Sequence, residues 1–282
     1  MGRIGTTIEL AKSSWRVLRA DKELLLLPVM SFVATIAVAA SFLAPLLVNV
    51  DETSVQDPGP VGYALMFVAY LVLAFITIFF NAALVHAANE RLEGGDPTVG
   101  SALRGAAERI GGVFAWSLVS ATVSIVLRAV QERGGLLGRI AGSIAGIAWS
   151  LVTFLVIPVL VIERVPVGDA IKRSGTLFKR TWGENVAARV GFGLLGFAAV
   201  LPAILVAGLG IAAGGALALV AIAAAVIWVL ATAMTLTALS GIFQTALYRH
   251  AAGLGTGTFG SSALQQAFAP KATRGFGGGF AG

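Results

Sequence analysis

The sequence contains no cysteine, only two histidines and few charged residues. The absence of cysteine excludes disulfides, thiolate metal sites and cysteine nucleophiles, and two histidines alone do not make a zinc site. Charged residues make up 12% of the 282, against roughly 25% in a soluble domain, and 57% are apolar. Because so few charges cannot cover a water-exposed surface, the sequence predicts an integral membrane protein.

Five stretches without charged residues or histidine are long enough to cross a bilayer: 24–50, 58–85, 110–127, 140–162 and 190–248. The last has 59 residues and as one helix would measure about 88 Å, against a hydrocarbon core of about 30 Å, so it must fold back. Glycines are expected to make that turn, at Gly208, Gly210, Gly214 and Gly215. We therefore expect an all-α polytopic protein with six transmembrane helices in three hairpins, over about 24–48, 61–88, 111–130, 140–162, 188–209 and 215–248.

The basic residues between these runs predict the orientation. The N-terminal segment carries Arg3, Lys12, Arg16, Arg19 and Lys22. The first loop carries only the acids Asp51, Glu52 and Asp57. This asymmetry predicts that both termini lie in the cytoplasm. The membrane is expected to be the plasma membrane of the cell. Three arginines between spans three and four argue against this orientation, namely Arg128, Arg133 and Arg139.

A basic amphipathic segment precedes each expected hairpin, over about 4–21, 97–110 and 166–183. In the second, Asp96 is expected to cap the helix, with Pro97 at the first helical position. Each segment should lie along the cytoplasmic membrane face, where its basic side meets anionic lipid headgroups. The residues predicted to do so are Lys12, Arg16, Arg19, Lys172, Arg173, Lys179 and Arg180.

Short segments of similar sequence indicate a threefold repeat, in which each unit consists of one interfacial helix and one hairpin. The segment 99–104 matches 167–172 in register, and 80–84 near the end of span two resembles 243–247 near the end of span six. The alternative is that membrane proteins in general have basic, aromatic helix ends. Beyond the spans, residues 253–282 are expected to form a mostly flexible, glycine-rich tail with a short helix at about 261–269.

The opening segment from Ser14 to Pro28, the third amphipathic segment and the close from Ala263 to Lys271 resemble a family of uncharacterised six-span membrane proteins. The family is prokaryotic and mainly actinobacterial, and its plan is loosely like the membrane domains that accompany glycerophosphodiester phosphodiesterases. The resemblance implies a six-span architecture and no assigned activity. The sequence contains no phosphodiesterase domain.

Two residue sets are candidate sites. Asn81, His86, Gln244 and Tyr248 are polar side chains near the ends of spans two and six, and the repeat places the two amides at equivalent depths. They either form interhelical hydrogen bonds that fix packing or contact a polar solute. The second set is a stripe of small residues on span four, which favours close helix packing within the monomer or self-association. The stripe consists of Gly138, Gly142, Gly146 and Ser150.

The spans contain no acidic residue, which argues against proton-coupled transport. No acid, base and nucleophile converge in the sequence, since the nearest pair is Ser240 with His86, so we expect no enzyme, no cofactor and no metal. No nucleic-acid partner is expected either. The function favoured is a non-catalytic membrane protein that organises lipids or partner proteins at the inner face. The alternative is a transporter or channel-like permease for a neutral or amphiphilic solute.

Overall fold

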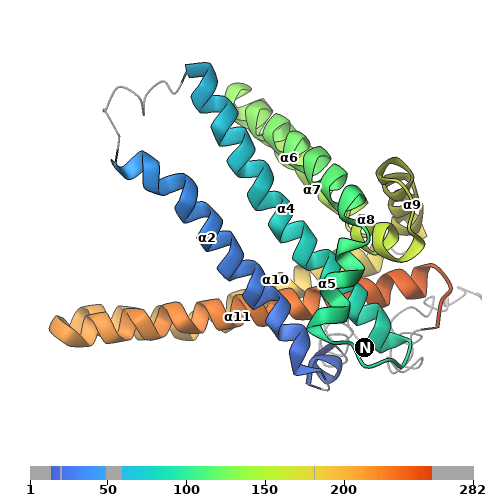
Figure 1. The fold of residues 1–282 in the computed structure, drawn as a ribbon. Coiled ribbons are helices and arrows are strands. Elements are labelled where there is room, and N and C mark those ends of the chain that lie inside the picture. Colours follow the sequence, from blue (N-terminus) through green and yellow to red (C-terminus); the bar gives the residue numbers. More distant parts are fainter. Residues whose placement is uncertain (1–13, 20, 49–58, 181, 256–282) are drawn as a thin grey trace, which may run out of the picture.

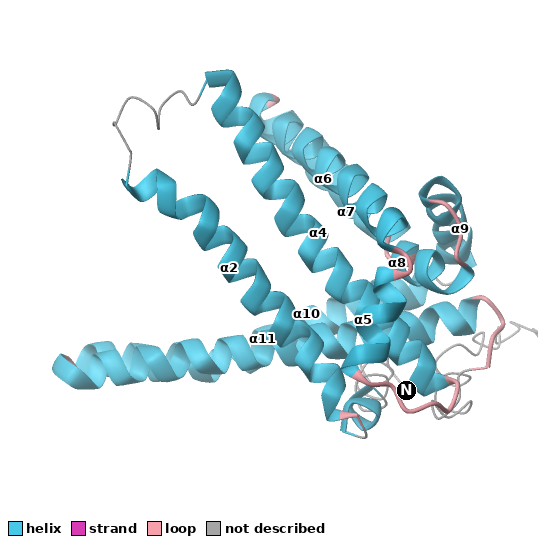
Figure 2. Ribbon diagram, viewed as in Figure 1, coloured by secondary structure: helices cyan, strands magenta, loops and turns pink. Residues whose placement is uncertain are grey.

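The computed structural model describes residues 14–19, 21–48, 59–180 and 182–255 (Figure 1). Within these ranges all regular structure is helical and no strand occurs (Figure 2). Six helical segments are long and apolar enough to cross a membrane. The protein is therefore a helical polytopic membrane protein. The expected helix at 261–269 and residues 4–13 of the first amphipathic segment lie outside the described residues.

The helices follow the apolar runs of the sequence. In chain order they are η1 (Lys22–Leu25), α2 (Leu26–Val48), α4 (Gly59–Leu92), α5 (Val99–Ala107), α6 (Ile110–Arg133), α7 (Gly135–Val152), α8 (Val156–Pro158), the π-helical η2 (Val159–Glu163), α9 (Val167–Arg180), α10 (Trp182–Ala213) and α11 (Gly215–Ala251). The stretch expected as one span over 140–162 is interrupted between α7 and α8. This interruption positions part of the candidate site.

The turn between α10 and α11 involves fewer residues than the four glycines of the sequence predicted. Helix α10 continues through Gly208 and Gly210, and the chain reverses at Gly214 and Gly215, whose φ angles are 70° and 58°. Glycine adopts such left-handed angles without the steric cost of a Cβ atom. A helix that continues to the last residue before the turn keeps its backbone hydrogen bonds satisfied in lipid, which offsets the poor helix propensity of glycine.

The prediction that Asp96 caps α5 is wrong. The cap is Thr98, whose Oγ1 accepts from the Ser101 amide at 3.1 Å while the Ser101 hydroxyl oxygen accepts from the Thr98 amide at 3.0 Å. This reciprocal capping box satisfies two backbone donors at once, which Asp96 could not do two residues earlier. Asp96 instead accepts from Arg91 at 3.3 Å.

The packed core lies at one end of the molecule. Buried side chains concentrate in the second halves of α4 and α11, at the start of α2 and α6, and in α8, η2 and α9. The far halves of the long helices expose large apolar side chains such as Val61 (75%) and Leu219 (72%). We call the packed end the inner end, because the basic segments lie there.

The helices leave the inner end in two directions. Helices α2, α4, α6 and α7 extend side by side, whereas the α10–α11 hairpin lies across them (Figure 1). At the crossing of α4 and α11, Ala82, Ala83 and Ala238 are fully buried, and a side chain at Gly241 would collide with Leu84. Small residues thus let the two backbones approach closely at one place. Beyond this crossing α4 and α11 run in different directions (Figure 1).

Candidate functional site

A pocket of about 300 Å³ lies between α4 and α11. It is partly open to its surroundings and is lined by Asn81, Leu236, Thr237, Ser240, Gly241 and Gln244. Two of the four polar residues singled out in the sequence, Asn81 and Gln244, therefore line one pocket. We call it the amide pocket.

Gln244 also binds a backbone group from a third segment. Its Nε2 donates a hydrogen bond to the carbonyl of Phe154, which lies in the interruption between α7 and α8. Ser174 of α9 satisfies the same interruption, since its hydroxyl donates to the Val152 carbonyl at 2.5 Å and accepts from the Leu155 amide at 3.2 Å. A helix broken inside a membrane protein needs such partners for its freed backbone groups. Gln244 therefore joins α11 to the interruption between α7 and α8.

Asn81 and Ser240 have no comparable role. Neither the Asn81 amide nor the Ser240 hydroxyl makes a hydrogen bond to any residue that the structure describes. The Thr237 hydroxyl donates to the Ala233 carbonyl of its own helix at 2.8 Å and keeps lone pairs free. A membrane-embedded amide without a partner costs free energy. The amide pocket therefore presents unused hydrogen-bonding groups to whatever occupies it.

The other two predicted polar residues lie elsewhere. The His86 ring packs against Gly105 of α5, so closely that a side chain at that glycine would collide with it. Tyr248 is 1% exposed and its hydroxyl donates to Glu163 Oε1 at 3.0 Å. Their positions assign both residues to packing of the inner end, away from the amide pocket.

A group of ion pairs holds the inner end together. Glu163 Oε1 also pairs with Arg173 Nε at 3.0 Å. The Arg249 guanidinium donates to Glu93 Oε1 and to Asn89 Oδ1, each at 2.7 Å, and so ties the end of α11 to the end of α4. The Arg249 side chain is 9% exposed, although the residue was not among the candidates from the sequence. Its one available signal was its position directly after the longest apolar run.

The third ion pair joins the start of the first span to α4. Arg91 Nε lies 2.7 Å from Asp21 Oδ2, and the Asp21 side chain is 8% exposed. Burial raises the pKa of the Asp21 carboxyl above its ordinary value of 3.8, and Arg91 opposes this rise. Asp96 and Glu23 add to the rise through their negative charges. The sequence analysis did not single out this buried carboxyl.

The predicted lipid-facing basic residues are placed unequally. On α9, Lys172 and Lys179 are exposed, whereas Arg173 is bound to Glu163. Near the N-terminus Arg16 and Arg19 are exposed, and the Arg19 guanidinium lies 5.2 Å from the centre of the Trp15 ring. Lys12 and the side chain of Arg180 lie outside the described part of the chain.

The small-residue stripe on α7 divides into two parts. A Cβ atom at Gly138 would lie 2.6 Å from the Val130 carbonyl oxygen of α6, and one at Gly142 would lie 2.5 Å from Cγ of Gln131. At Gly146 such an atom would meet nothing within 4 Å among the described residues. The Ser150 hydroxyl donates to the Ile147 carbonyl of its own helix at 2.8 Å. The first half of the stripe therefore packs within the monomer.

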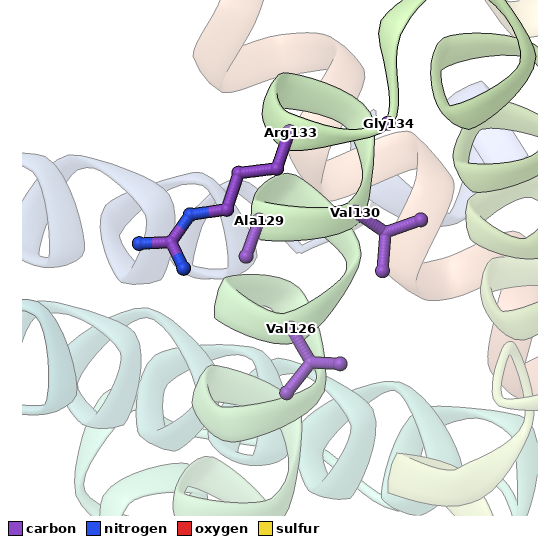
Figure 3. Close-up of a pocket in the computed structure, with 5 residues that line it drawn as sticks. All are labelled: Val126, Ala129, Val130, Arg133 and Gly134. Atoms are coloured by element: carbon purple, nitrogen blue, oxygen red, sulfur yellow. The ribbon is translucent and has the colours of Figure 1, made fainter.

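A second pocket of about 480 Å³ lies at the far end of α6. Val126, Ala129, Val130, Arg133 and Gly134 line it, with Arg133 reaching away from the helix and Val130 pointing to the opposite side (Figure 3). Arg133 is its only charged lining residue, and no further polar side chain converges on it. The amide pocket is therefore the stronger candidate for a binding site.

Comparison with known proteins places the chain in a family. No curated protein matches the sequence. The profile of one family of unknown function (DUF6159) matches residues 60–259, which is more than half of the chain. The matched region runs from α4 through α11 and includes the amide pocket, α9 and the ion pairs of Glu163 and Arg249. The chain belongs to this family of unknown function, DUF6159.

Proposed function

We propose that this protein is a non-catalytic integral membrane protein that organises lipids or partner proteins at the inner face of the plasma membrane, with both termini cytoplasmic. The family is of unknown function, and the helical membrane architecture is compatible with such a role. In this proposal three units, each an interfacial helix and a hairpin, build the molecule. The contacts of α2 with α4, α6 with α7 and α10 with α11 support that division.

The observation that carries the proposal is the placement of α9. Its residues Ala170, Ser174 and Leu177 are fully buried and Phe178 is 8% exposed, so its apolar side packs on the protein core. Its opposite side exposes Lys172 and Lys179. A helix held in this way cannot insert its apolar face into lipid, but it keeps its cations at a fixed place on the inner end. We infer that this basic side receives anionic headgroups or an acidic partner surface.

The energetics favour headgroups over internal pairing. The pair of Lys172 with Asp169 spans 3.7 Å, and both side chains are more than half exposed. Such a surface pair contributes about 0–1 kcal/mol, so little is lost when the lysine turns to another anion. A basic residue near an anionic membrane surface contributes about 1 kcal/mol of attraction.

The transport alternative needs a polar path through the molecule. Residues that neighbour the lining of the amide pocket on the same helices, Ala82, Ala83, Ile242 and Phe243, are each at most 1% exposed. This tight packing among the described residues supports organisation of lipids or partners over solute passage. The likeness to membrane domains that accompany glycerophosphodiester phosphodiesterases remains a prediction from sequence, as does the absence of enzymatic activity.

The test uses purified full-length protein titrated with phosphatidylglycerol, with bound lipid counted by native mass spectrometry. Replacing Lys172 and Lys179 together by glutamine should weaken binding by about 30-fold, which corresponds to about 2 kcal/mol. The control pair Arg128→Gln and Arg139→Gln removes two exposed cations near the far ends of α6 and α7 and should leave this binding unchanged. Equal loss in both pairs, or no loss in the first, would contradict the role of α9.

A further inference from the structure

We propose that the amide pocket binds the uncharged polar group of a neutral membrane lipid, which enters sideways from the bilayer between α4 and α11. The inference goes beyond the proposed role of α9, because it concerns a different site and a different lipid chemistry. It rests on the free hydrogen-bonding groups of the pocket, the lack of charge in its lining, its depth and the apolar faces beside it.

The free groups define what the ligand must offer. Asn81 supplies two amide donors and a carbonyl acceptor, and Ser240 supplies a hydroxyl, none of them used within the described chain. The side-chain amide of Gln244 donates one hydrogen bond to the Phe154 carbonyl, and the side-chain carbonyl oxygen of Gln244 remains available. A ligand that both donates and accepts, such as one with hydroxyl and ester carbonyl groups, satisfies them together. An apolar chain alone would leave the Asn81 amide buried without a partner.

The lining excludes a charged headgroup. None of the six lining residues is ionisable. Asn81 precedes Glu90, the first charged residue after it on α4, by nine residues, and Ser240 precedes Arg249 of α11 by the same number. Nine helical residues span about 14 Å, so the pocket lies well within the hydrocarbon region when those charges are at the interface. A phosphate at this depth would need a cationic partner that the lining does not provide.

The burial of the neighbouring residues favours entry from the bilayer. On the same two helices Ala82, Ala83, Ile242 and Phe243 are each at most 1% exposed, so the lining residues border the packed core. The parts of α4 and α11 that precede the lining residues expose apolar side chains such as Val68 and Ile227. In this proposal the apolar body of the lipid lies along these exposed faces while its polar group reaches the Asn81 amide.

Two variants separate ligand binding from helix packing. Asn81→Leu removes an amide that has no protein partner, so the thermal stability of the full-length protein in detergent should not fall. Gln244→Leu removes the bond to Phe154 and should lower that stability. If Asn81→Leu destabilises the protein as much as Gln244→Leu, Asn81 serves packing and the proposal is overturned.

The direct test uses the full-length protein in lipid nanodiscs with a diacylglycerol that carries a photoreactive acyl chain. Phosphatidic acid with the same chain is the charged comparison. We expect the neutral probe to label α4 or α11 beside the pocket, and Asn81→Leu to reduce this labelling by about tenfold, as the loss of one or two hydrogen bonds implies. Ser143→Ala, an exposed hydroxyl on α7, is the matched control and should label as the natural protein does.

Three results would overturn the proposal. Labelling by the neutral probe could be unchanged in Asn81→Leu, which would show that the amide does not hold the lipid. Labelling could be spread evenly over all lipid-exposed helices, which would show that no site exists. Phosphatidic acid could label the pocket as strongly as diacylglycerol, which would contradict selection of an uncharged group.

Discussion

Arg249 joins the ends of two long helices through one buried guanidinium. It contacts Asn89 of α4 and Glu93, which directly follows α4, and its Nε donates to the Gly255 carbonyl at 2.7 Å. A buried charge is tolerated only when it is paired and hydrogen-bonded, and here three acceptors surround it. Specific polar contacts of single residues therefore hold the inner end together. Apolar contacts alone would not select one arrangement of the helices, because the surrounding lipid is apolar as well.

We expect Arg249→Gln to lower the free energy of unfolding by about 1.5–3 kcal/mol, the usual contribution of hydrogen bonds to a charged group. The loss of unfolding free energy should not exceed this range, because Glu93 is 56% exposed and water can solvate its carboxylate after the change. The control is Arg164→Gln, whose pair with Glu108 spans 3.5 Å between exposed side chains and should contribute no more than about 1 kcal/mol. Unfolding in mixed detergent micelles measures both; equal effects would contradict the account.

Asp21 predicts a pH dependence of stability. Because burial raises the pKa of its carboxyl in the folded protein, folding favours the protonated form. Its contribution is therefore fully present below the unfolded value of 3.8 and is lost as the pH rises through the raised pKa. Asp21→Asn should remove this part of the decline, which begins as the pH rises above 3.8.

The control for Asp21 is Asp96→Asn, which removes the exposed partner of the same arginine. Because burial raises the pKa of Asp21 more than the charge of Asp96 does, this change should leave most of the decline with pH in place. If the unfolding free energies of Asp21→Asn and of the natural protein change in parallel as the pH rises above 3.8, the assignment to Asp21 is wrong.

At the scale of elements, the small-residue stripe shows how α7 uses its two halves. Gly138 and Gly142 lie against α6, whereas Gly146 has open space around its Cα atom within the described chain. The same sequence spacing thus produces a tight contact at one end and a free surface at the other. Self-association through span four remains a prediction, and it would use the free half.

Replacing glycine by alanine at the two ends of the stripe should have opposite effects. Alanine at 138 meets the Val130 carbonyl, a backbone atom that cannot turn aside, and should destabilise the protein by about 1–3 kcal/mol. Alanine at 146 meets nothing and should stabilise it by up to about 1 kcal/mol through helix propensity. Detergent unfolding of Gly138→Ala and Gly146→Ala measures the difference; a loss of stability at 146 would contradict the packing described.

The elements differ in how far the sequence predicts them. Apolar runs of 18 or more residues predict helices because a bilayer leaves few alternatives, and six such helices are present. The pairing of Arg249 with Glu93 joins residues 156 positions apart, and no local pattern indicates it. The sequence does not predict the crossing of α4 by α11 either. Helix α11 is apolar on all sides for most of its length, so no apolar stripe marks the side that packs.

The candidate site was predictable in part for a similar reason. The similarity between 80–84 and 243–247 placed Asn81 and Gln244 at equivalent depths, and both line the amide pocket. Nothing in the sequence identified the Phe154 carbonyl as the partner of Gln244, because that carbonyl is freed only by the interruption between α7 and α8. His86 and Tyr248 belonged to the same polar set, but neighbours in α5 and η2 hold them elsewhere.

At the scale of the whole molecule, packing is concentrated at the inner end, and the far halves of the helices are left to lipid. The buried core, the ion pairs and α9 with its exposed lysines all lie at this end. The proposed role at the inner face requires that this end meet the cytoplasm. The proposed role therefore depends on the orientation of the molecule in the membrane.

Labelling of single introduced cysteines tests the orientation of the protein in the membrane, because the natural sequence contains no cysteine. Thr176 is exposed on α9 at the inner end, and Arg133 is exposed at the far end of α6. In intact cells, Arg133→Cys should react with a membrane-impermeant maleimide, and Thr176→Cys should react only after the membrane is permeabilised. Reaction of Thr176→Cys in intact cells, with Arg133→Cys protected, would contradict the account.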